Sequence, residues 1–236
     1  MRGIIFYSNT NQSRAAAAYL AELTGWDLYD LNCQAQGLAA SQAVFDRAVL
    51  VFPVHCQNMP RAIADFLKEL RAKRLAVVAT YGKMCHGGVL YEVQKRYRAG
   101  EIVAAAYLPM QHAYLKAQTV PALDALQGLA EKMTAPDPKP VQVPRSYKNP
   151  LADLFPAARS RMGVGMRIDP EKCMRCGKCE SECAEGGVID GKFTNRCVRC
   201  LKCATNCPAG AISHHVRLPM RLYLKKKPTE HAEAYL

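Results

Sequence analysis

Short apolar runs alternate with amphipathic stretches over roughly the first 135 residues of the chain. Four runs are continuously apolar, as is typical of strands in a parallel sheet that is covered on both faces, whereas residues 26–31 alternate. Helix patterns separate most of these runs. The order therefore predicts an α/β domain with a doubly wound sheet of five parallel strands. The expected strands are 3–7, 26–31, 48–54, 75–80 and 103–108, and the expected helices are 12–23, 61–70, 88–98 and 123–133.

Eight cysteines near the C-terminus form two runs with the same spacing, CxxCxxCxxxC, within 35 residues. Thiolates at this spacing are typical of 4Fe-4S cubane sites. Zinc sites more often take two ligands from a short run and mix Cys with His. Disulfides would suit a secreted chain, but the apolar stretch at residues 3–7 is too short for a signal peptide. The pattern therefore favours two iron-sulfur clusters.

The last 70 or so residues resemble a bacterial dicluster ferredoxin. In that family the fourth cysteine of each run binds the other cluster. The resemblance thus assigns Cys173, Cys176, Cys179 and Cys207 to cluster 1, and Cys197, Cys200, Cys203 and Cys183 to cluster 2.

The first run departs from the family pattern, because Ala184 replaces the proline found after Cys207. We expect a local loosening at that exit turn and unequal potentials for the two clusters. The glycines in 185–196 predict a hairpin between the runs.

The loop after the first expected strand reads Ser8-Asn9-Thr10-Asn11-Gln12-Ser13 and resembles the flavodoxin phosphate loop. In flavodoxins this loop surrounds the FMN phosphate at a helix N-terminus. Asn9 and Asn11 replace glycines here, and Asn tolerates positive φ better than other side chains. The alternative is an ordinary N-cap of the first helix.

Two further loops follow the third and fourth strands, where flavodoxins cover the two faces of the isoalloxazine. Tyr81 is the candidate for stacking on the flavin, and the alternative for Tyr81 is a core aromatic at a strand end. The resemblance implies these FMN-binding positions: Pro53, Val54, His55, Cys56, Gln57, Asn58, Thr80, Tyr81, Gly82, Lys83, Gly87 and Gly88.

The whole chain resembles the clostridial family of fused flavodoxin-ferredoxin electron-transfer proteins. This implies an FMN domain at 1–134, a Pro-rich linker with a short helix (150–160) at 135–165, and a dicluster ferredoxin domain with a basic tail at 166–236. A Pro-rich segment is extended and stiff, so we expect a spacer that still leaves the domains docked. The implied function is the passing of electrons between FMN and two 4Fe-4S clusters.

His55, Cys56, Cys85 and His86 are expected to project over the flavin site. They either line the pocket or supply a metal site or a redox thiol pair. No catalytic residue is firm, and Cys56 and His55 are weak candidates. One alternative function is therefore an FMN-dependent reductase of a disulfide, quinone or nitro compound. A second alternative, motivated by the missing glycines, is a scaffold without FMN in which only the clusters act.

The chain is strongly basic, with 32 Lys and Arg against 20 Asp and Glu. A basic face around the clusters would attract an acidic redox protein or a larger oxidoreductase. Nucleic acid is disfavoured because no recognition motif occurs, and no apolar stretch is long enough to span a membrane. A cytoplasmic location is expected, and homodimerisation stays open. The expected ring is Arg175, Lys178, Lys192, Arg196, Arg199 and Lys202, extended by Lys225, Lys226 and Lys227.

Overall fold

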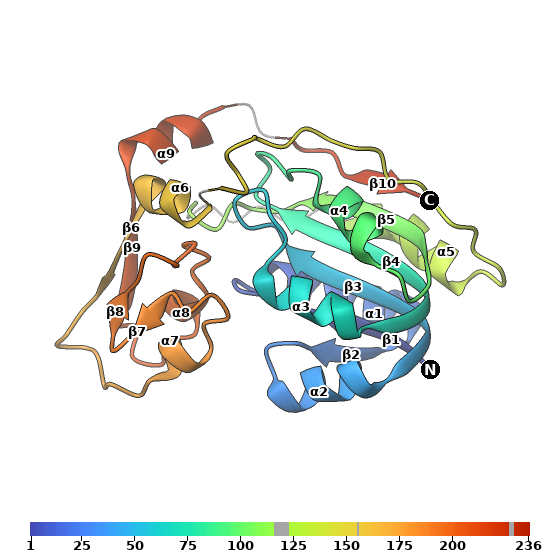
Figure 1. Cartoon of the computed structure of the whole chain (residues 1–236), viewed down its shortest axis with the longest axis horizontal. Coiled ribbons are helices and arrows are strands. Elements are labelled where there is room, and N and C mark those ends of the chain that lie inside the picture. The colour runs from blue at the N-terminus through green and yellow to red at the C-terminus, as the bar shows by residue number, and fades with distance from the viewer. Residues whose placement is uncertain (116–122, 155, 227–228) are drawn as a thin grey trace.

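The larger part of the protein is a six-stranded sheet (Figure 1), seen in a computed structural model that describes residues 1–115, 123–154, 156–226 and 229–236. The five strands expected from the sequence pair in parallel in the order β2-β1-β3-β4-β5, which is the flavodoxin-like order. The strands are β1 (Arg2–Phe6), β2 (Asp27–Asp30), β3 (Val44–Pro53), β4 (Arg71–Tyr81), β5 (Glu101–Pro109) and β10 (Glu233–Tyr235).

Helices cover both faces of this sheet. Successive residues of a strand point to opposite faces, so Ile4 belongs to one apolar layer and Ile5 to the other. The Ile4 layer packs on α1 (Gln12–Thr24) and α5 (Gln127–Thr134), which follows a 3-10 turn, η1 (Leu123–Leu126). The Ile5 layer packs on α2 (Gln34–Gln42), α3 (Arg61–Glu69) and α4 (Val89–Arg96).

Helix α2 is absent from the sequence prediction, which placed no helix between the second and third strands. Ala40 is its one buried residue, so it has no apolar stripe of the kind that marks a packed helix. The other helices of the sheet domain were predicted at nearly their observed positions.

The cysteine runs lie in a small region built on two antiparallel pairs, β6 with β9 and β7 with β8. The predicted hairpin is present, and its turn residues Asp190 and Gly191 both have positive φ, as a type I′ turn requires. The elements of this ferredoxin region (156–226) are α6 (Pro156–Gly163), β6 (Val164–Ile168), α7 (Lys178–Ser181), β7 (Val188–Ile189), β8 (Lys192–Phe193), α8 (Lys202–Thr205), β9 (Ile212–Val216) and α9 (Leu218–Leu224).

The helix expected at 150–160 begins later than predicted. Phe155 lies outside the described residues, residues 150–154 form a turn, and α6 starts at Pro156.

The Pro-rich segment does not hold the two parts of the molecule away from each other. It has no helix or strand and runs along the sheet domain (Figure 1). The Val141 N–H donates to the carbonyl oxygen of Ile102 over 2.9 Å, and the Gln94 amide bonds the backbone of Val141 and of Val143. The segment is therefore a brace on the sheet domain.

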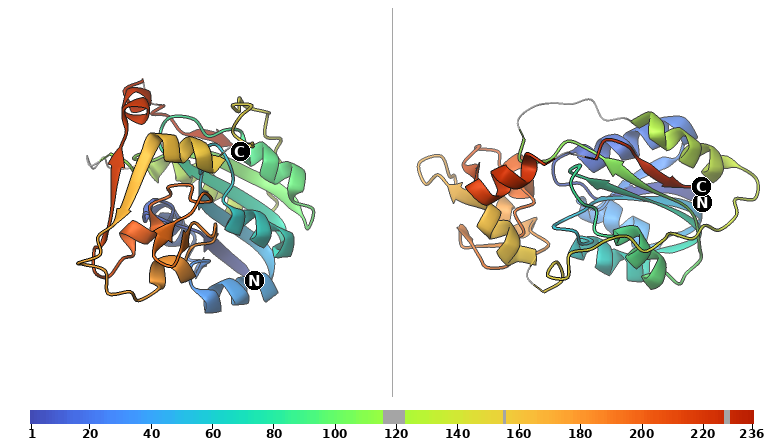
Figure 2. Two further views of the ribbon diagram at one scale, coloured as in Figure 1. Left: turned by 60° about the vertical axis from the view of Figure 1, so that its left-hand side comes forward. Right: turned by 90° about the horizontal axis from the view of Figure 1, so that it is seen from above.

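The C-terminal residues, which the sequence assigned to the ferredoxin domain, return to the sheet. The Thr229 N–H donates to the Lys83 carbonyl oxygen over 2.6 Å, and β10 then pairs antiparallel with β5. Both chain ends consequently lie at the same end of the molecule (Figure 2). The chain crosses between its two parts twice, which restricts their relative position.

Candidate redox centres

The eight cysteines gather into two groups that cross the two sequence runs. Burial raises the pKa of Cys179, and its thiol neighbours Cys173, Cys176 and Cys207 add to this effect. Burial likewise raises the pKa of Cys200 to about 12, with contributions from Cys203, Cys197 and Cys183. Each group thus contains the fourth cysteine of the other run. We call these two groups the cluster-1 thiols (Cys173, Cys176, Cys179, Cys207) and the cluster-2 thiols (Cys197, Cys200, Cys203, Cys183).

The repeated spacing is also a repeated backbone conformation. The residue before the second cysteine of each run, Arg175 or Arg199, has a left-handed φ, of 53° or 58°. The residue after it, Gly177 or Leu201, is left-handed as well, with φ of 72° or 64°. A left-handed side chain costs about 1–2 kcal/mol per residue. Such strain is concentrated at functional sites, because there it fixes the direction of neighbouring groups.

The exit turns after the two fourth cysteines are alike despite the missing proline. The Gly187 N–H donates to Cys183 Sγ over 3.1 Å, and the Ala211 N–H donates to Cys207 Sγ over 3.4 Å. Both donors lie four residues after the cysteine. The local loosening expected at Ala184 is therefore not observed.

The two thiol groups differ in burial. Among the cluster-2 thiols Cys197 is buried, and the group lines a cavity of about 30 Å³ together with Tyr7 and His55 of the sheet domain. Among the cluster-1 thiols Cys176 is exposed. In the described ranges no three His, Cys, Asp or Glu side chains converge as on a single metal ion. A cubane spreads its four thiolates over a larger cage, so cysteines alone suit such a site.

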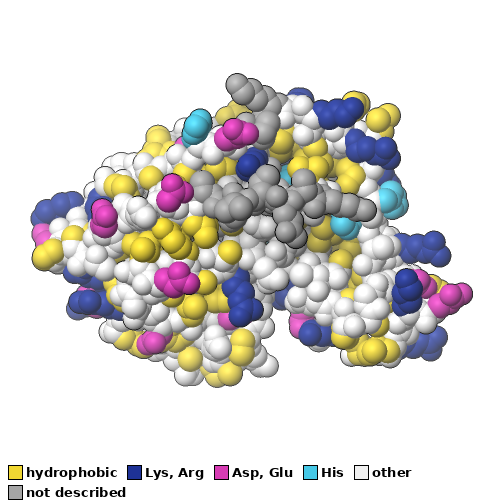
Figure 3. All heavy atoms as spheres, turned by 180° about the vertical axis from the view of Figure 1, so that it is seen from behind, with side chains coloured by type: hydrophobic (Ala, Val, Ile, Leu, Met, Phe, Trp, Pro, Cys, Tyr) yellow, Lys and Arg dark blue, Asp and Glu magenta, His cyan; other side chains and the backbone are white. Residues whose placement is uncertain are grey.

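The expected basic ring is incomplete, because two of its members are buried. Arg199 is 9% exposed and donates through Nε to the Val164 carbonyl oxygen over 3.2 Å. Lys202 is 8% exposed, donates to the Glu182 carbonyl oxygen and lies 5.5 Å from the Tyr7 ring centre. Figure 3 shows Lys and Arg side chains at the outer end of the ferredoxin region. The exposed members are Arg175, Lys178, Lys192, Arg196, Lys225 and Lys226, and Lys227 lies outside the described residues.

A cavity of about 270 Å³ lies where the loops at the carboxyl ends of β1, β3, β4 and β5 meet the ferredoxin region. We call it the interdomain pocket. Its volume is close to the lower limit of about 300 Å³ for small-molecule sites. The predicted FMN residues that line it are Asn9, Thr10, Gln12, Pro53, Val54, His55, Cys56, Gln57, Thr80, Tyr81 and Gly82. The predicted positions outside the lining are Ser8, Asn11, Ser13, Asn58, Lys83, Gly87 and Gly88.

The loop before α1 has the features of an anion site. Asn11 takes a left-handed φ of 63°, as a glycine would at this position. Ser13 Oγ lies 2.8 Å from Thr80 Oγ1 and joins the loops after β1 and β4. The buried Ser8 hydroxyl, a possible donor to an anion, has no hydrogen-bond partner among the described residues. The first turn of α1 has no acidic residue, so its free N–H groups suit a phosphate. These residues fit the phosphate end of FMN.

The loop after β3 is a tight turn closed by two backbone hydrogen bonds between His55 and Asn58, of 2.9 and 2.8 Å. Its central residues, Cys56 and Gln57, both have positive φ, which a type I′ turn demands and which Asn-Gly usually supplies. The Asn58 amide donates to the Ala152 carbonyl oxygen over 2.8 Å, and Gln57 Oε1 accepts from the Asn149 N–H. The segment that follows the brace therefore holds this loop in place.

The protonation states of His55 and Cys56, the weak catalytic candidates, do not suit acid-base or thiol chemistry. Burial lowers the pKa of His55 to about 4, so its ring is neutral, and Nε2 lies 2.6 Å from the Asn9 amide nitrogen. Burial raises the pKa of Cys56 to about 11, although Arg159 and a hydrogen bond with Ser160 act in the opposite direction. A thiol with this pKa is protonated at neutral pH, so it is a poor nucleophile.

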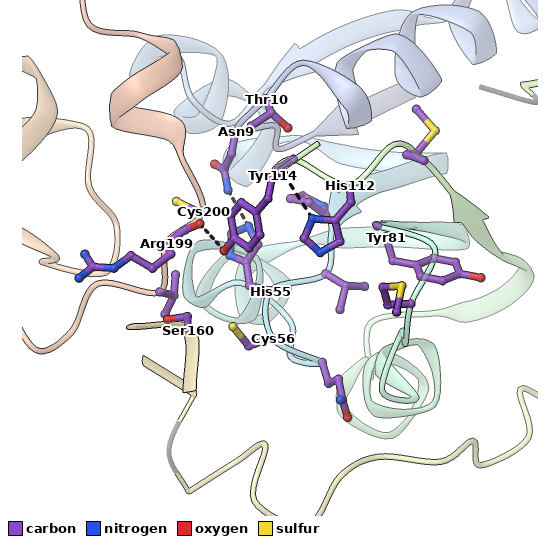
Figure 4. A pocket seen from close by; sticks show the side chains of 18 of the residues that line it. Asn9, Thr10, His55, Cys56, Tyr81, His112, Tyr114, Ser160, Arg199 and Cys200 are labelled. Carbon is purple, nitrogen blue, oxygen red and sulfur yellow. Dashed lines mark hydrogen bonds between the residues drawn. The ribbon is translucent and has the colours of Figure 1, made fainter. Parts of the chain in front are cut away.

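The Tyr81 ring does not suit a stacking role in this arrangement. Tyr81 is 4% exposed, and its ring meets the rings of His86 and Tyr107 edge-on. Its ring points away from the other labelled side chains of the pocket (Figure 4), where Tyr114 and His112 lie instead. Neither residue was predicted from the sequence as part of the site, although both follow the end of a predicted strand.

Cys85 and His86 were also expected over the flavin site; Cys85 lines the pocket and His86 does not. The His86 ring stacks on Tyr107 with 3.6 Å between centroids, and its Nε2 lies 3.4 Å from Glu233 Oε1. Burial lowers the pKa of His86, while Glu233 opposes that effect. His86 is thus a contact to β10.

The ferredoxin region supplies the remaining wall of the interdomain pocket. Cys200, a cluster-2 thiol, lines this pocket as well as the cluster-2 cavity. The Tyr114 hydroxyl donates to the Arg199 carbonyl oxygen over 2.8 Å. On the far side, the Arg61 N–H at the start of α3 donates to Glu185 Oε1 over 3.3 Å. This carboxylate complements the positive end of the α3 dipole, so the two parts dock at several points.

Comparisons with known proteins locate a ferredoxin motif in the second part of the chain. Residues 192–213 match the family model described as "4Fe-4S binding domain". No curated protein matches the chain. A ferredoxin-type 4Fe-4S motif and a sheet with flavodoxin-like strand order are thus joined in one chain. In the described part of the chain no helix combines the length and apolarity needed to cross a bilayer.

Two solved structures are similar over 55–56% of this chain. A protein from Bacteroides uniformis assigned as a flavoprotein aligns over 55% of this chain and 97% of its own, with 14% identity and a TM-score of 0.39. A flavodoxin, WrbA-like protein from Agrobacterium tumefaciens aligns over 56% of this chain and 98% of its own, with 10% identity and a TM-score of 0.38.

Proposed function

We propose that the protein is an electron-transfer protein that holds FMN in the interdomain pocket and one 4Fe-4S cluster in each thiol group. The electron path connects FMN with cluster 2, cluster 2 with cluster 1, and cluster 1 with a redox partner. When bound, FMN exchanges two electrons and each cluster exchanges one.

One observation carries this proposal: His55 and Cys200 line both the interdomain pocket and the cluster-2 cavity. A cofactor in the pocket would therefore be separated from a cluster-2 ligand by side chains of a shared wall. Electron transfer through protein weakens steeply with distance, so a shared wall favours transfer across it. The cluster-1 thiols line no part of the interdomain pocket.

The residues around the pocket have separable tasks. The loop before α1 holds the phosphate through its N–H groups and through the unpartnered Ser8 hydroxyl, which can donate a hydrogen bond. His112 and Tyr114 supply aromatic surface for an isoalloxazine. Met220 and Tyr223 of α9 supply a further apolar part of the wall. None of these tasks needs a proton donor or a nucleophile.

The partner is proposed to dock over cluster 1. Cys176 is exposed there, beside Met174 at 63% exposure and the exposed Arg175. An apolar side chain within a basic surface suits a transient complex with an acidic redox protein.

The test is anaerobic purification of the full chain, followed by flavin and iron analysis. We expect one FMN and about eight iron atoms per chain, as two cubanes require. After photoreduction of the flavin by light and an external donor, cluster signals should appear by electron paramagnetic resonance without a partner protein. Iron near eight without FMN would replace this proposal with the scaffold that uses clusters alone.

The reductase alternative has its own outcome in the same preparation. Turnover of a disulfide, quinone or nitro compound that is lost in Cys56→Ser would favour the reductase. Cys33→Ser is the matched control, because Cys33 is exposed and lies outside the pocket. The raised pKa of Cys56 leads us to expect no loss of electron transfer in either variant.

A further inference from the structure

We infer that Arg159 of α6 is a tuning residue for the bound flavin: its guanidinium neutralises the negative charge that the flavin gains on reduction. This inference rests on the proposed function, since it requires FMN in the interdomain pocket. It adds a direction to the electron path.

Arg159 is a cation without a partner at the pocket wall. Its Nη1 atom is buried and donates no hydrogen bond to any described residue, and the side chain forms no ion pair with one. Leaving a buried charged donor unsatisfied is destabilising, because the donor has lost its hydration and gained no partner. A group in the pocket that carries negative charge would remove this cost.

Apart from Cys200, whose thiolate the proposed cluster 2 would bind, no described side chain of the pocket wall competes for Arg159 with a negative charge. Within the described residues, no Asp or Glu lines the pocket. The nearby thiol Cys56 is neutral, and burial lowers the pKa of His112 to about 4, so that ring is neutral too. Burial raises the pKa of Tyr223, and Arg159 opposes this effect, which indicates that the guanidinium acts within the pocket.

The other arginine at the pocket does not share this role. Arg199 extends away from Tyr114 and His112 (Figure 4). Its Nε donates to the Val164 carbonyl oxygen, and its guanidinium lies 5.3 Å from the Phe193 ring centre. Although Arg199 Nη1 also lacks a hydrogen-bond partner among the described residues, these contacts hold its guanidinium in the ferredoxin region, so we assign the pocket cation to Arg159.

A positive charge in a low-dielectric pocket acts more strongly on the reduced flavin than on the neutral oxidised form. The protein should consequently bind reduced FMN more tightly, which raises the flavin potential. Cluster 2 is not affected in the same way, because Arg159 does not line its cavity. Electrons that enter from the clusters would therefore collect on the flavin.

The experiment compares Arg159→Gln, Arg159→Lys and Arg161→Gln in the holoprotein. Arg161 is the matched control, since it lies on the same helix but not at the pocket. We expect Arg159→Gln to lower the ratio of affinities for reduced and oxidised FMN at least tenfold. That corresponds to about 30 mV in a two-electron midpoint potential. Arg159→Lys should retain most of the wild-type ratio of affinities for reduced and oxidised FMN. Arg161→Gln should leave that ratio unchanged.

The readouts are the flavin midpoint in a redox titration and the Kd of oxidised FMN. An unchanged midpoint in Arg159→Gln, or an equal loss of affinity for both flavin forms, would overturn the inference and leave the proposed function standing. A wild-type protein that binds no FMN would overturn both. Cluster midpoints that move together with the flavin midpoint would also contradict a role confined to the pocket.

Discussion

The Tyr114 hydroxyl donates a 2.8 Å hydrogen bond to the carbonyl oxygen of Arg199, the residue before Cys200. The donor lies in the loop after β5, and the acceptor lies in the cluster-2 binding loop. One hydrogen bond thus connects the interdomain pocket with the loop that presents a cluster-2 thiol.

Replacing Tyr114 with Phe should weaken this connection without emptying either site. Loss of the hydrogen bond should lower the free energy of unfolding by about 1 kcal/mol. It should also slow electron exchange between flavin and clusters, because the spacing across the shared wall is less constrained. Denaturant unfolding and rapid kinetics measure the two effects. Tyr147→Phe is the control, since Tyr147 is 71% exposed, and equal results for both variants would contradict the prediction.

Serine substitutions at Cys200 and Cys176 should separate the two clusters. Each variant should lose about four of about eight iron atoms, since each removes a ligand of one cubane. Photoreduced flavin should still pass electrons to a cluster in Cys176→Ser but not in Cys200→Ser. Iron analysis and electron paramagnetic resonance measure this. The reverse pattern would mean that cluster 1 is the neighbour of the flavin.

Asn11 should tolerate glycine better than alanine, because its φ is 63°. Asn11 makes no side-chain cap hydrogen bond, so backbone conformation dominates the effect of substitution. Asn11→Ala should lower the free energy of unfolding by about 1–2 kcal/mol, and Asn11→Gly should not. Thermal or denaturant unfolding measures both. Equal destabilisation by the two substitutions would show that the asparagine side chain itself is required.

Cys56 should react slowly with iodoacetamide at neutral pH, and its rate should rise as pH approaches about 11. The thiolate is the reactive form, and a raised pKa keeps the thiol protonated over the neutral range. Mass spectrometry of the labelled holoprotein measures the rate, with the exposed Cys33 as internal reference. Rapid labelling of Cys56 at pH 7 would contradict the raised pKa and favour the thiol-based reductase.

The sheet domain could be predicted from the sequence, because its central strands are buried on both faces and therefore form continuous apolar runs. The hairpin at Asp190 and Gly191 could be predicted as well, because its turn requires positive φ and such turns favour Asp-Gly. Helix α2 escaped prediction because it has no apolar face. Strand β10 escaped as well, because its pairing with β5 joins residues more than a hundred positions apart.

At the site, the predicted FMN loops converge, but several individual roles changed. Tyr81 has the expected position at a strand end, yet its ring is buried beside His86 and Tyr107. Two residues of the basic ring are buried: Lys202 lies against Tyr7 of the docked sheet domain, and Arg199 contacts Val164 and Phe193 within the ferredoxin region. Solvent exposure of a single charged residue depends on what packs against it, which a sequence pattern does not record.

The sequence by itself determined the two cysteine runs, the order of the parallel strands and the polar loops at their carboxyl ends. These features depend on short spacings along the chain, where geometry follows from residue type. The tertiary structure decided that Cys200 and His55 share a wall and that Arg159 reaches the pocket without a partner. Such relationships arise from the docking of two parts that are distant in sequence, so they depend on packing that no local pattern specifies.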